Sequence, residues 1–398
     1  INDATDAALT ASSLSAIGSK TTGTVTVSNA VVISGTAVEL TAALVTADTF
    51  VVAATAKATI NDATDAALTA SSLSAIGGKT SGTVTVNNAV VISGTAAEVI
   101  AALVTTDTLV VAASAKVTIN DASGTTLNAI DLIAIGGKTT GTVTVSNAVV
   151  ISGTAAEVTA ALTRVGASSA KVTVTDAISV GDVNAIAVKT SGVVTATLVT
   201  GSLASFSDLA ETGNAYTVTV NDAADTAQTA SALSTLGGKT TGPVTVNNAV
   251  VISGTAAQVL AALVTEDTRV VASTAKITIT DTISVDNLNA IKAKTSGVIA
   301  ATLQPTHTGQ GEGINWGWFD SFIQTRIIQL GGGDDIIRYD ARNKNIQMTD
   351  EIDAGAGFDT IIMLGGALSF PVDNNLKNVE KFIVHAHSGA TLNLTGQT

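Results

Sequence analysis

The sequence TVTVSNAVVISGTAVELTAALV, from Thr24 to Val45, decides the fold because the chain contains it four times with few changes. The other copies lie at residues 83–104, 142–162 and 244–264. Each copy belongs to a longer unit, since residues 1–59 are identical to residues 60–118 at 49 of 59 positions. Such a period predicts a solenoid, a propeller or another array of stacked units.

Two structural elements are indicated within this phrase. Val25 and Val27 alternate with threonines, which is typical of a half-buried β-strand. Thr36 and Glu39 then fit a capping box, in which a hydroxyl and a carboxylate accept from the free amides at a helix start. The box recurs at Thr95 and Glu98, at Thr154 and Glu157, and at Thr255 and Gln258, with looser versions at Ser179 and Asp182 and at Ser205 and Asp208.

Glycines mark the expected helix ends, where a left-handed residue often closes the last turn. These glycines are Gly18, Gly77, Gly78, Gly136, Gly137, Gly213, Gly237 and Gly238. Each 59-residue unit contains two passages of this kind, each a strand run followed by a helix and a turn. The strand runs begin near residues 24, 50, 83, 109, 142, 170, 193, 216, 244, 269 and 298.

Stacking is required because neither a helix of about two turns nor a single strand is stable alone. We therefore predict a repeat solenoid over residues 1–304, with stacked coils of short parallel β-strands and one short α-helix per coil. A propeller is disfavoured because each of its blades consists of four antiparallel strands. About eleven coils at roughly 4.8 Å each would form a rod.

The composition excludes several classes of protein. The net charge is −13, with only 19 basic residues, so we expect no binding to nucleic acid and no docking on anionic lipid. No apolar run approaches the roughly 18 residues of a membrane-spanning helix, and no membrane insertion is expected. The chain has no cysteine, and no histidine precedes His307, so the repeats hold no catalytic triad. We expect no enzymatic activity.

An aspartate recurs at one position of the repeat. It is found at Asp3, Asp62, Asp121, Asp176, Asp222 and Asp281. We interpret it as a turn or N-cap residue that closes each coil. The alternative is an outer ladder that binds cations, although stacked like charges would repel each other.

The tail after Gln304 differs from the repeats in composition and in sequence pattern. Residues 305–325 are rich in glycine, contain both tryptophans and are expected to form a junction. The stretches LGGGDDIIR (330–338) and AGAGFDTII (354–362) then fit the nonapeptide G-G-x-G-x-D-x-U-x, each with its first glycine replaced. They resemble hemolysin-type (RTX) calcium-binding repeats, which implies a small RTX-like β-roll over residues 326–398.

The resemblance implies one Ca²⁺ site. Its ligands would be the carboxylates of Asp335 and Asp359 and the carbonyls of Gly331, Gly333, Gly355 and Gly357. The two turns are 24 residues apart, which allows one to stack on the other if the opposite turn is enlarged. The alternative is a pair of glycine-rich turns without metal.

The repeats also resemble those of long secreted surface proteins of cyanobacteria and other Gram-negative bacteria. The similar stretches are ISVGDVNAIAVKTSGVVTATL (178–198), LAETGNAYTVTV (209–220) and NVEKFIVHAHSGATLNLTG (378–396). This resemblance implies an extracellular, cell-surface location and export without a cleaved N-terminal signal. Because the sequence opens within a repeat, we also expect it to continue in a longer chain.

Two functions are compatible with these patterns. The first is that of an extracellular structural protein, a rod whose partner is the protein itself, by head-to-tail or lateral assembly into a fibre, filament or surface layer. The second is that of an adhesin, a module that binds surface polysaccharide or a neighbouring cell at the end of a solenoid stalk.

In the intact protein, Ca²⁺ is expected to raise the melting temperature of the tail relative to EDTA, because a ligand of the folded state stabilises it. Differential scanning calorimetry measures the shift. Asp335→Asn combined with Asp359→Asn should abolish it, whereas Asp48→Asn should not. Identical melting curves in Ca²⁺ and EDTA would favour the metal-free turns.

Overall fold

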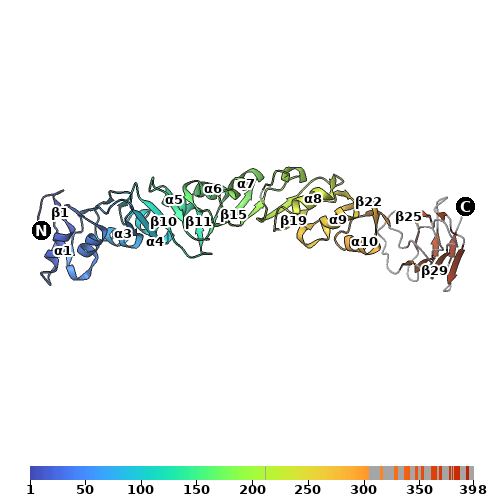
Figure 1. Cartoon of the computed structure of the whole chain (residues 1–398), viewed down its shortest axis with the longest axis horizontal. Helices are drawn as coiled ribbons and strands as arrows, with labels where there is room; N and C mark the ends of the chain where they lie inside the picture. Colours follow the sequence, from blue (N-terminus) through green and yellow to red (C-terminus); the bar gives the residue numbers. More distant parts are fainter. Residues whose placement is uncertain are drawn as a thin grey trace. The chain divides into compact units, whose positions relative to one another are not determined.

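The computed structural model describes residues 1–303 except Glu211 and, beyond them, Val379 and the tail strands whose bounds are given below. The chain forms two compact units, residues 1–198 with 214–216 and residues 199–213 with 217–398. Up to residue 303, short strands that pair in parallel alternate with short helices, which defines an α/β repeat architecture (Figure 1). The division predicted at residues 304 and 325 stays a prediction.

The first 59-residue unit shows how the repeat folds. Its elements are β1 (Ala8–Thr10), α1 (Ala11–Gly18), β2 (Val25–Thr26), β3 (Val32–Gly35), α2 (Ala37–Leu40), η1 (Thr41–Val45), η2 (Ala47–Thr49), β4 (Val51–Val52) and β5 (Lys57–Ile60). The second copy contains β6 (Ala67–Thr69), α3 (Ala70–Gly77), β7 (Val84–Val86), β8 (Val91–Gly94), α4 (Ala96–Leu103), β9 (Val110–Val111) and β10 (Lys116–Ile119). Such short strands depend on pairing with neighbours for their stability.

Pairing joins strands that are about 25 residues apart in sequence. In the sheet with the order β1-β3-β5-β7-β9, Leu9 lies opposite Ile33, Ile33 opposite Ala58, and Ala58 opposite Val84, always in parallel. We call the segment between two partners a coil. The next sheet, β14-β12-β10-β8-β6, has the same arrangement one 59-residue repeat later in the sequence. It includes β12 (Val143–Val145) and β14 (Val165–Gly166).

The rest of the first compact unit, up to residue 198, continues this pattern. It contains β11 (Thr126–Asn128), α5 (Ala129–Gly136), β13 (Val150–Gly153), α6 (Ala155–Arg164), β15 (Lys171–Ile178), α7 (Val180–Ala187) and β16 (Val194–Leu198). β11 pairs with β13, β13 with β15, and β15 with β16, again in parallel. The register shifts between Thr173 and Ala177, where β15 bulges.

The second compact unit, which comprises residues 199–213 and 217–398, begins with a shortened helix. Its elements up to residue 303 are η3 (Leu203–Phe206), β17 (Ala215–Val220, from Thr217 on), β18 (Ala227–Thr229), α8 (Ala230–Gly237), β19 (Val244–Val246), β20 (Val251–Gly254), α9 (Ala256–Leu263), η4 (Glu266–Thr268), β21 (Val270–Val271), β22 (Lys276–Ile283), α10 (Val285–Lys292) and β23 (Ile299–Leu303). Their pairs are parallel as well.

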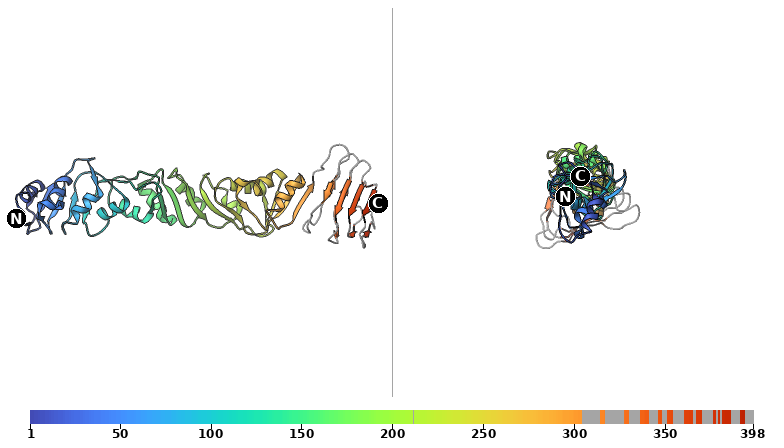
Figure 2. Two further views of the ribbon diagram at one scale, coloured as in Figure 1. Left: turned by 90° about the horizontal axis from the view of Figure 1, so that it is seen from below. Right: turned by 90° about the vertical axis from the view of Figure 1, so that its left-hand side faces the viewer.

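The described strands of the tail form three parallel stacks (Figure 2). The first continues the sheet of β23 with β25 (Ile327–Gln329), β28 (Glu351–Asp353) and β31 (Leu376–Lys377). The second contains β24 (Ile314–Trp316), β26 (Ile336–Asp340), β29 (Thr360–Leu364) and β32 (Lys381–His385). The third contains β27 (Ile346–Gln347), β30 (Ala367–Ser369) and β33 (Thr391–Asn393).

Small aliphatic side chains form the core of the repeats. Ile33 and its counterpart Ile92 point inward from their strands and are fully buried. Leu14 and Leu73 reach the same core from the helices. Because aromatic residues are only 3% of the chain, the core is a thin layer in which many short apolar side chains repeat with the period of the sequence.

The structure confirms much of the local prediction. All four capping boxes form, and the strands expected near residues 83 and 142 begin at Val84 and Val143. Ser179 caps α7 as expected, but the cap predicted at Ser205 is wrong, because Ser202 accepts from the Ser205 N–H. The short strand β6 and its counterparts were not predicted, since three residues such as Ala67–Thr69 carry no clear alternation.

The explanation for the helix-terminal glycines is also wrong in most copies. Of those predicted, Gly213 is left-handed with φ of 84°, whereas Gly78, the C-cap of α3, has a right-handed φ of −69°. Gly77 is needed for a different reason. A Cβ atom there would lie 2.4 Å from the carbonyl oxygen of Thr108, so glycine lets the helix approach the backbone of the next coil.

Gly77→Ala should therefore destabilise the contact between α3 and the Thr108 turn, by about 1–3 kcal/mol for an overpacked site. Gly78→Ala is the matched control, because its Cβ would lie 3.4 Å from the nearest atom, an ordinary contact. Hydrogen exchange should show lost protection near Thr108 in Gly77→Ala alone. Equal protection in the two variants would contradict the close-approach explanation.

Candidate functional site

The residues predicted to bind calcium lie outside the described residues. These are Asp335, Asp359, Gly331, Gly333, Gly355 and Gly357. The strands that follow the two turns are described, and β26 pairs with β29 so that Ile336 lies opposite Thr360 and Ile337 opposite Ile361. This register has the offset of 24 residues on which the single-site prediction depends, and calcium binding stays a prediction.

The recurring aspartates bind the backbone of the preceding coil. The Ala37 N–H donates to Asp62 Oδ2 at 2.7 Å, and this amide is the first of helix α2. The same bond joins Ala96 to Asp121, Ala155 to Asp176, Leu203 to Asp222 and Ala256 to Asp281, at 2.6–2.7 Å. Each of these five aspartates therefore caps a helix that lies a coil earlier in sequence, which refines the predicted capping role.

The helix N-terminus receives a second carboxylate from its own capping box. Glu39 Oε2 accepts from the Thr36 N–H at 2.8 Å, while Thr36 Oγ1 accepts from the Glu39 N–H at 3.2 Å. Together with Asp62, these groups satisfy three amides that the helix cannot bond internally. Two carboxylates at this end also interact favourably with the positive end of the helix dipole.

An asparagine side chain extends the connection to the following coil. Asn88 Nδ2 donates to the Asp62 backbone carbonyl at 2.6 Å, and Asn147 and Asn248 bond Asp121 and Asp222 in the same way. Asp62 thus binds Ala37 through its carboxylate and Asn88 through its carbonyl, which links three successive coils. We call this arrangement the aspartate node.

Three surface ion pairs also recur, and the sequence did not reveal them. Lys57 lies 2.8 Å from Asp6, Lys116 2.7 Å from Asp65, and Lys276 2.6 Å from Asp225. The partners are 51 residues apart, so only the stacking of coils brings them together. The backbone of these aspartates has a left-handed conformation, with positive φ. The third copy has a glycine with positive φ, Gly124, at this position.

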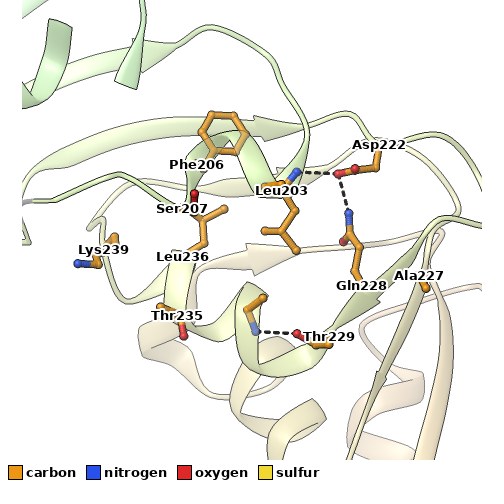
Figure 3. Close-up of a pocket in the computed structure, with 12 residues that line it drawn as sticks. Leu203, Phe206, Ser207, Asp222, Ala227, Gln228, Thr229, Thr235, Leu236 and Lys239 are labelled. Atoms are coloured by element: carbon orange, nitrogen blue, oxygen red, sulfur yellow. Dashed lines mark hydrogen bonds between the residues drawn. The ribbon is translucent and has the colours of Figure 1, made fainter. Parts of the chain in front are cut away.

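The second compact unit contains a groove beside η3, where the repeat pattern is interrupted. η3 is a single four-residue turn, whereas the corresponding helices α4 and α9 have eight residues. A pocket of about 440 Å³ lies between η3, β18 and α8 (Figure 3). Leu203, Leu236 and Ala232 contribute apolar surface to it, and Asp222, Gln228 and Lys239 contribute polar groups.

Two polar side chains are joined at one end of this groove. Asp222 Oδ2 accepts from the Leu203 N–H at 2.7 Å and from Gln228 Nε2 at 2.8 Å (Figure 3). Lys239 Nζ donates to the Ala210 carbonyl at 3.2 Å. The sequence prediction missed this site, although a signal was present: Gln228 replaces the leucine found at Leu9, Leu68 and Leu127 in the other copies.

No protein-family model matches the chain, and searches of curated proteins and of solved structures found no match. Within the described part of the chain, no helix is long and apolar enough to cross a membrane.

Asp121→Ala should weaken the start of α4, since loss of an N-cap acceptor costs about 1 kcal/mol. The direct readout is hydrogen exchange at the Ala96 amide, which should accelerate while the Ala155 amide, capped by Asp176, stays protected. Asp65→Gly is the control, because it removes an exposed ion pair of small stabilising effect and keeps a left-handed residue. Unchanged exchange at Ala96 would contradict the aspartate-node account.

Proposed function

We propose that the protein is an extracellular structural protein whose coils form an α/β-solenoid rod that assembles into a surface fibre, filament or layer. The observation that carries this proposal is the aspartate node. The polar side chains that recur with the repeat bind neighbouring coils, as Asp62 binds Ala37 and Asn88. A repeated unit whose polar groups serve its own stacking is suited to extension, and no catalytic step is proposed for it.

The tail is proposed to form an RTX-like β-roll that calcium stabilises. Support comes from the two nonapeptide turns and from the parallel register of the strands that follow them. Asp335 and Asp359 would supply carboxylates and the neighbouring glycines carbonyl oxygens, the hard oxygen ligands that Ca²⁺ prefers. The secreted surface proteins that the repeats resemble support the extracellular location.

An apolar feature that recurs on the surface supports self-association. Phe50 and Val52 are 42% and 47% exposed in the first copy, and Leu109 and Val111 are 41% and 48% exposed in the second. We call these four residues the apolar pairs. Exposed apolar side chains that cluster often mark contact sites, and a second copy of the chain presents the same pairs at the same spacing.

Phe50→Asn combined with Leu109→Asn should weaken self-association without unfolding the protein. Phe50 and Leu109 are left-handed, with φ of 51° and 47°, a conformation that asparagine tolerates better than large apolar residues. Sedimentation velocity over a range of concentrations measures association, and negative-stain electron microscopy shows the assemblies. We expect at least a tenfold higher concentration for half-assembly, equivalent to about 1.4 kcal/mol.

The matched control is Val38→Ser combined with Ile130→Ser, which removes two exposed apolar side chains from helices outside the apolar pairs. This variant should assemble like the wild type. Dispersed monomers of the wild-type protein at high concentration, with and without Ca²⁺, would refute the assembly proposal.

A second function is that of an adhesin or polysaccharide-binding module carried by the solenoid. The groove beside η3 favours it, because there the repeat departs from its own pattern: η3 is shortened, and Gln228 adds a polar side chain at a position where the other copies have leucine.

A further inference from the structure

Gln228 is the most unusual residue of the groove between η3 and α8. Leu68 and Leu127 occupy the same position of the repeat and are buried, as expected for a core leucine. Gln228 is equally buried, with 4% of its surface exposed, so a polar amide takes the place of an apolar core side chain. Burial of a polar group is unfavourable unless hydrogen bonds compensate for it.

Within the described residues, only the nitrogen of this amide has a hydrogen-bond partner. Gln228 Nε2 donates to Asp222 Oδ2 at 2.8 Å, and a carboxylate can only accept, so the orientation of the amide is fixed. The buried Oε1 accepts no hydrogen bond from the described residues. Figure 3 shows this oxygen on the side of the amide that faces Leu203, which also lines the groove. A buried acceptor of this kind requires a donor.

The surroundings restrict the chemistry of that donor. Leu203 and Leu236 provide an apolar wall, and the volume of about 440 Å³ lies within the range of small-ligand pockets. The Asp222 carboxylate beside Gln228 disfavours an anion at this end. The Lys239 ammonium on the lining disfavours a cation at the other. A neutral molecule with hydroxyl donors and an apolar face satisfies all three conditions.

We propose that this groove binds a neutral sugar unit. One sugar hydroxyl donates to Gln228 Oε1, and the C–H face of the ring packs against Leu203 and Leu236. Ser207 and Thr235 also line the groove and are exposed; their hydroxyls donate to Asp208 Oδ1 and to the Ser231 carbonyl, which leaves their oxygens as acceptors for further hydroxyls of the ligand. This inference rests on the second proposed function, for which it names the ligand class and the site, and it is independent of self-assembly.

The test uses the full-length protein and a defined set of probes. These are glucose, galactose, mannose, maltose and lactose, with glucuronate and glucosamine as charged counterparts. Saturation-transfer-difference NMR and titration should show that at least one neutral probe binds and that the charged counterparts bind more weakly. Gln228→Leu should weaken binding at least tenfold, because it removes the acceptor.

Gln228→Leu is expected to fold, since it restores the residue that three other copies contain at this position. Circular dichroism and thermal melting verify its fold, and Thr280→Val on an exposed position of β22 is the control for binding. Three outcomes would overturn the proposal: no neutral probe binds at millimolar concentration, a charged counterpart binds best, or Gln228→Leu binds as tightly as the wild type. Each of them would leave the result of the sedimentation experiment unaffected, so the two proposals can fail separately.

Discussion

The repeats depend on one hydrogen bond, from the first amide of a helix to the aspartate of the following coil. A helix of eight residues leaves its first amides without partners inside the helix, and it is too short to be stable by itself. Asp121 accepts from Ala96 across this boundary, and its own carbonyl accepts from Asn147 of the coil after it. Capping a helix and joining coils are therefore the same interaction, which makes each coil a condition for the stability of its neighbour.

This coupling explains how the chain can fold with few aromatic and few charged side chains. With 3% aromatic residues and 13% charged residues, no coil buries enough surface to fold alone. Parallel pairing of strands such as β8 and β10 adds backbone hydrogen bonds at every step, and close approach at Gly77 brings helix and neighbouring turn into contact. Stability then comes from neighbouring repeats, as in other repeat proteins, and this is the physical basis for proposing a structural role.

Much of this arrangement could be predicted because the local signals agree with the period. The capping box at Thr95 and the strand at Val84 are encoded within a few residues, so the sequence was sufficient for both. The strand Ala67–Thr69 exists only through pairing with β8, and the contact of Lys116 with Asp65 joins residues 51 positions apart, so neither has a local signal. Gln228 could have been found by comparing the copies, but its burial and its unpaired oxygen required the structure.

In this account, local contacts between neighbouring coils hold the stack of repeats together. Single-molecule force spectroscopy on the full chain, pulled from its two ends, tests this claim most directly. Nearest-neighbour coupling predicts a series of unfolding steps, each releasing about one 59-residue unit or less of chain. Release of all the repeats in one cooperative step, or extension at low force without any steps, would contradict it.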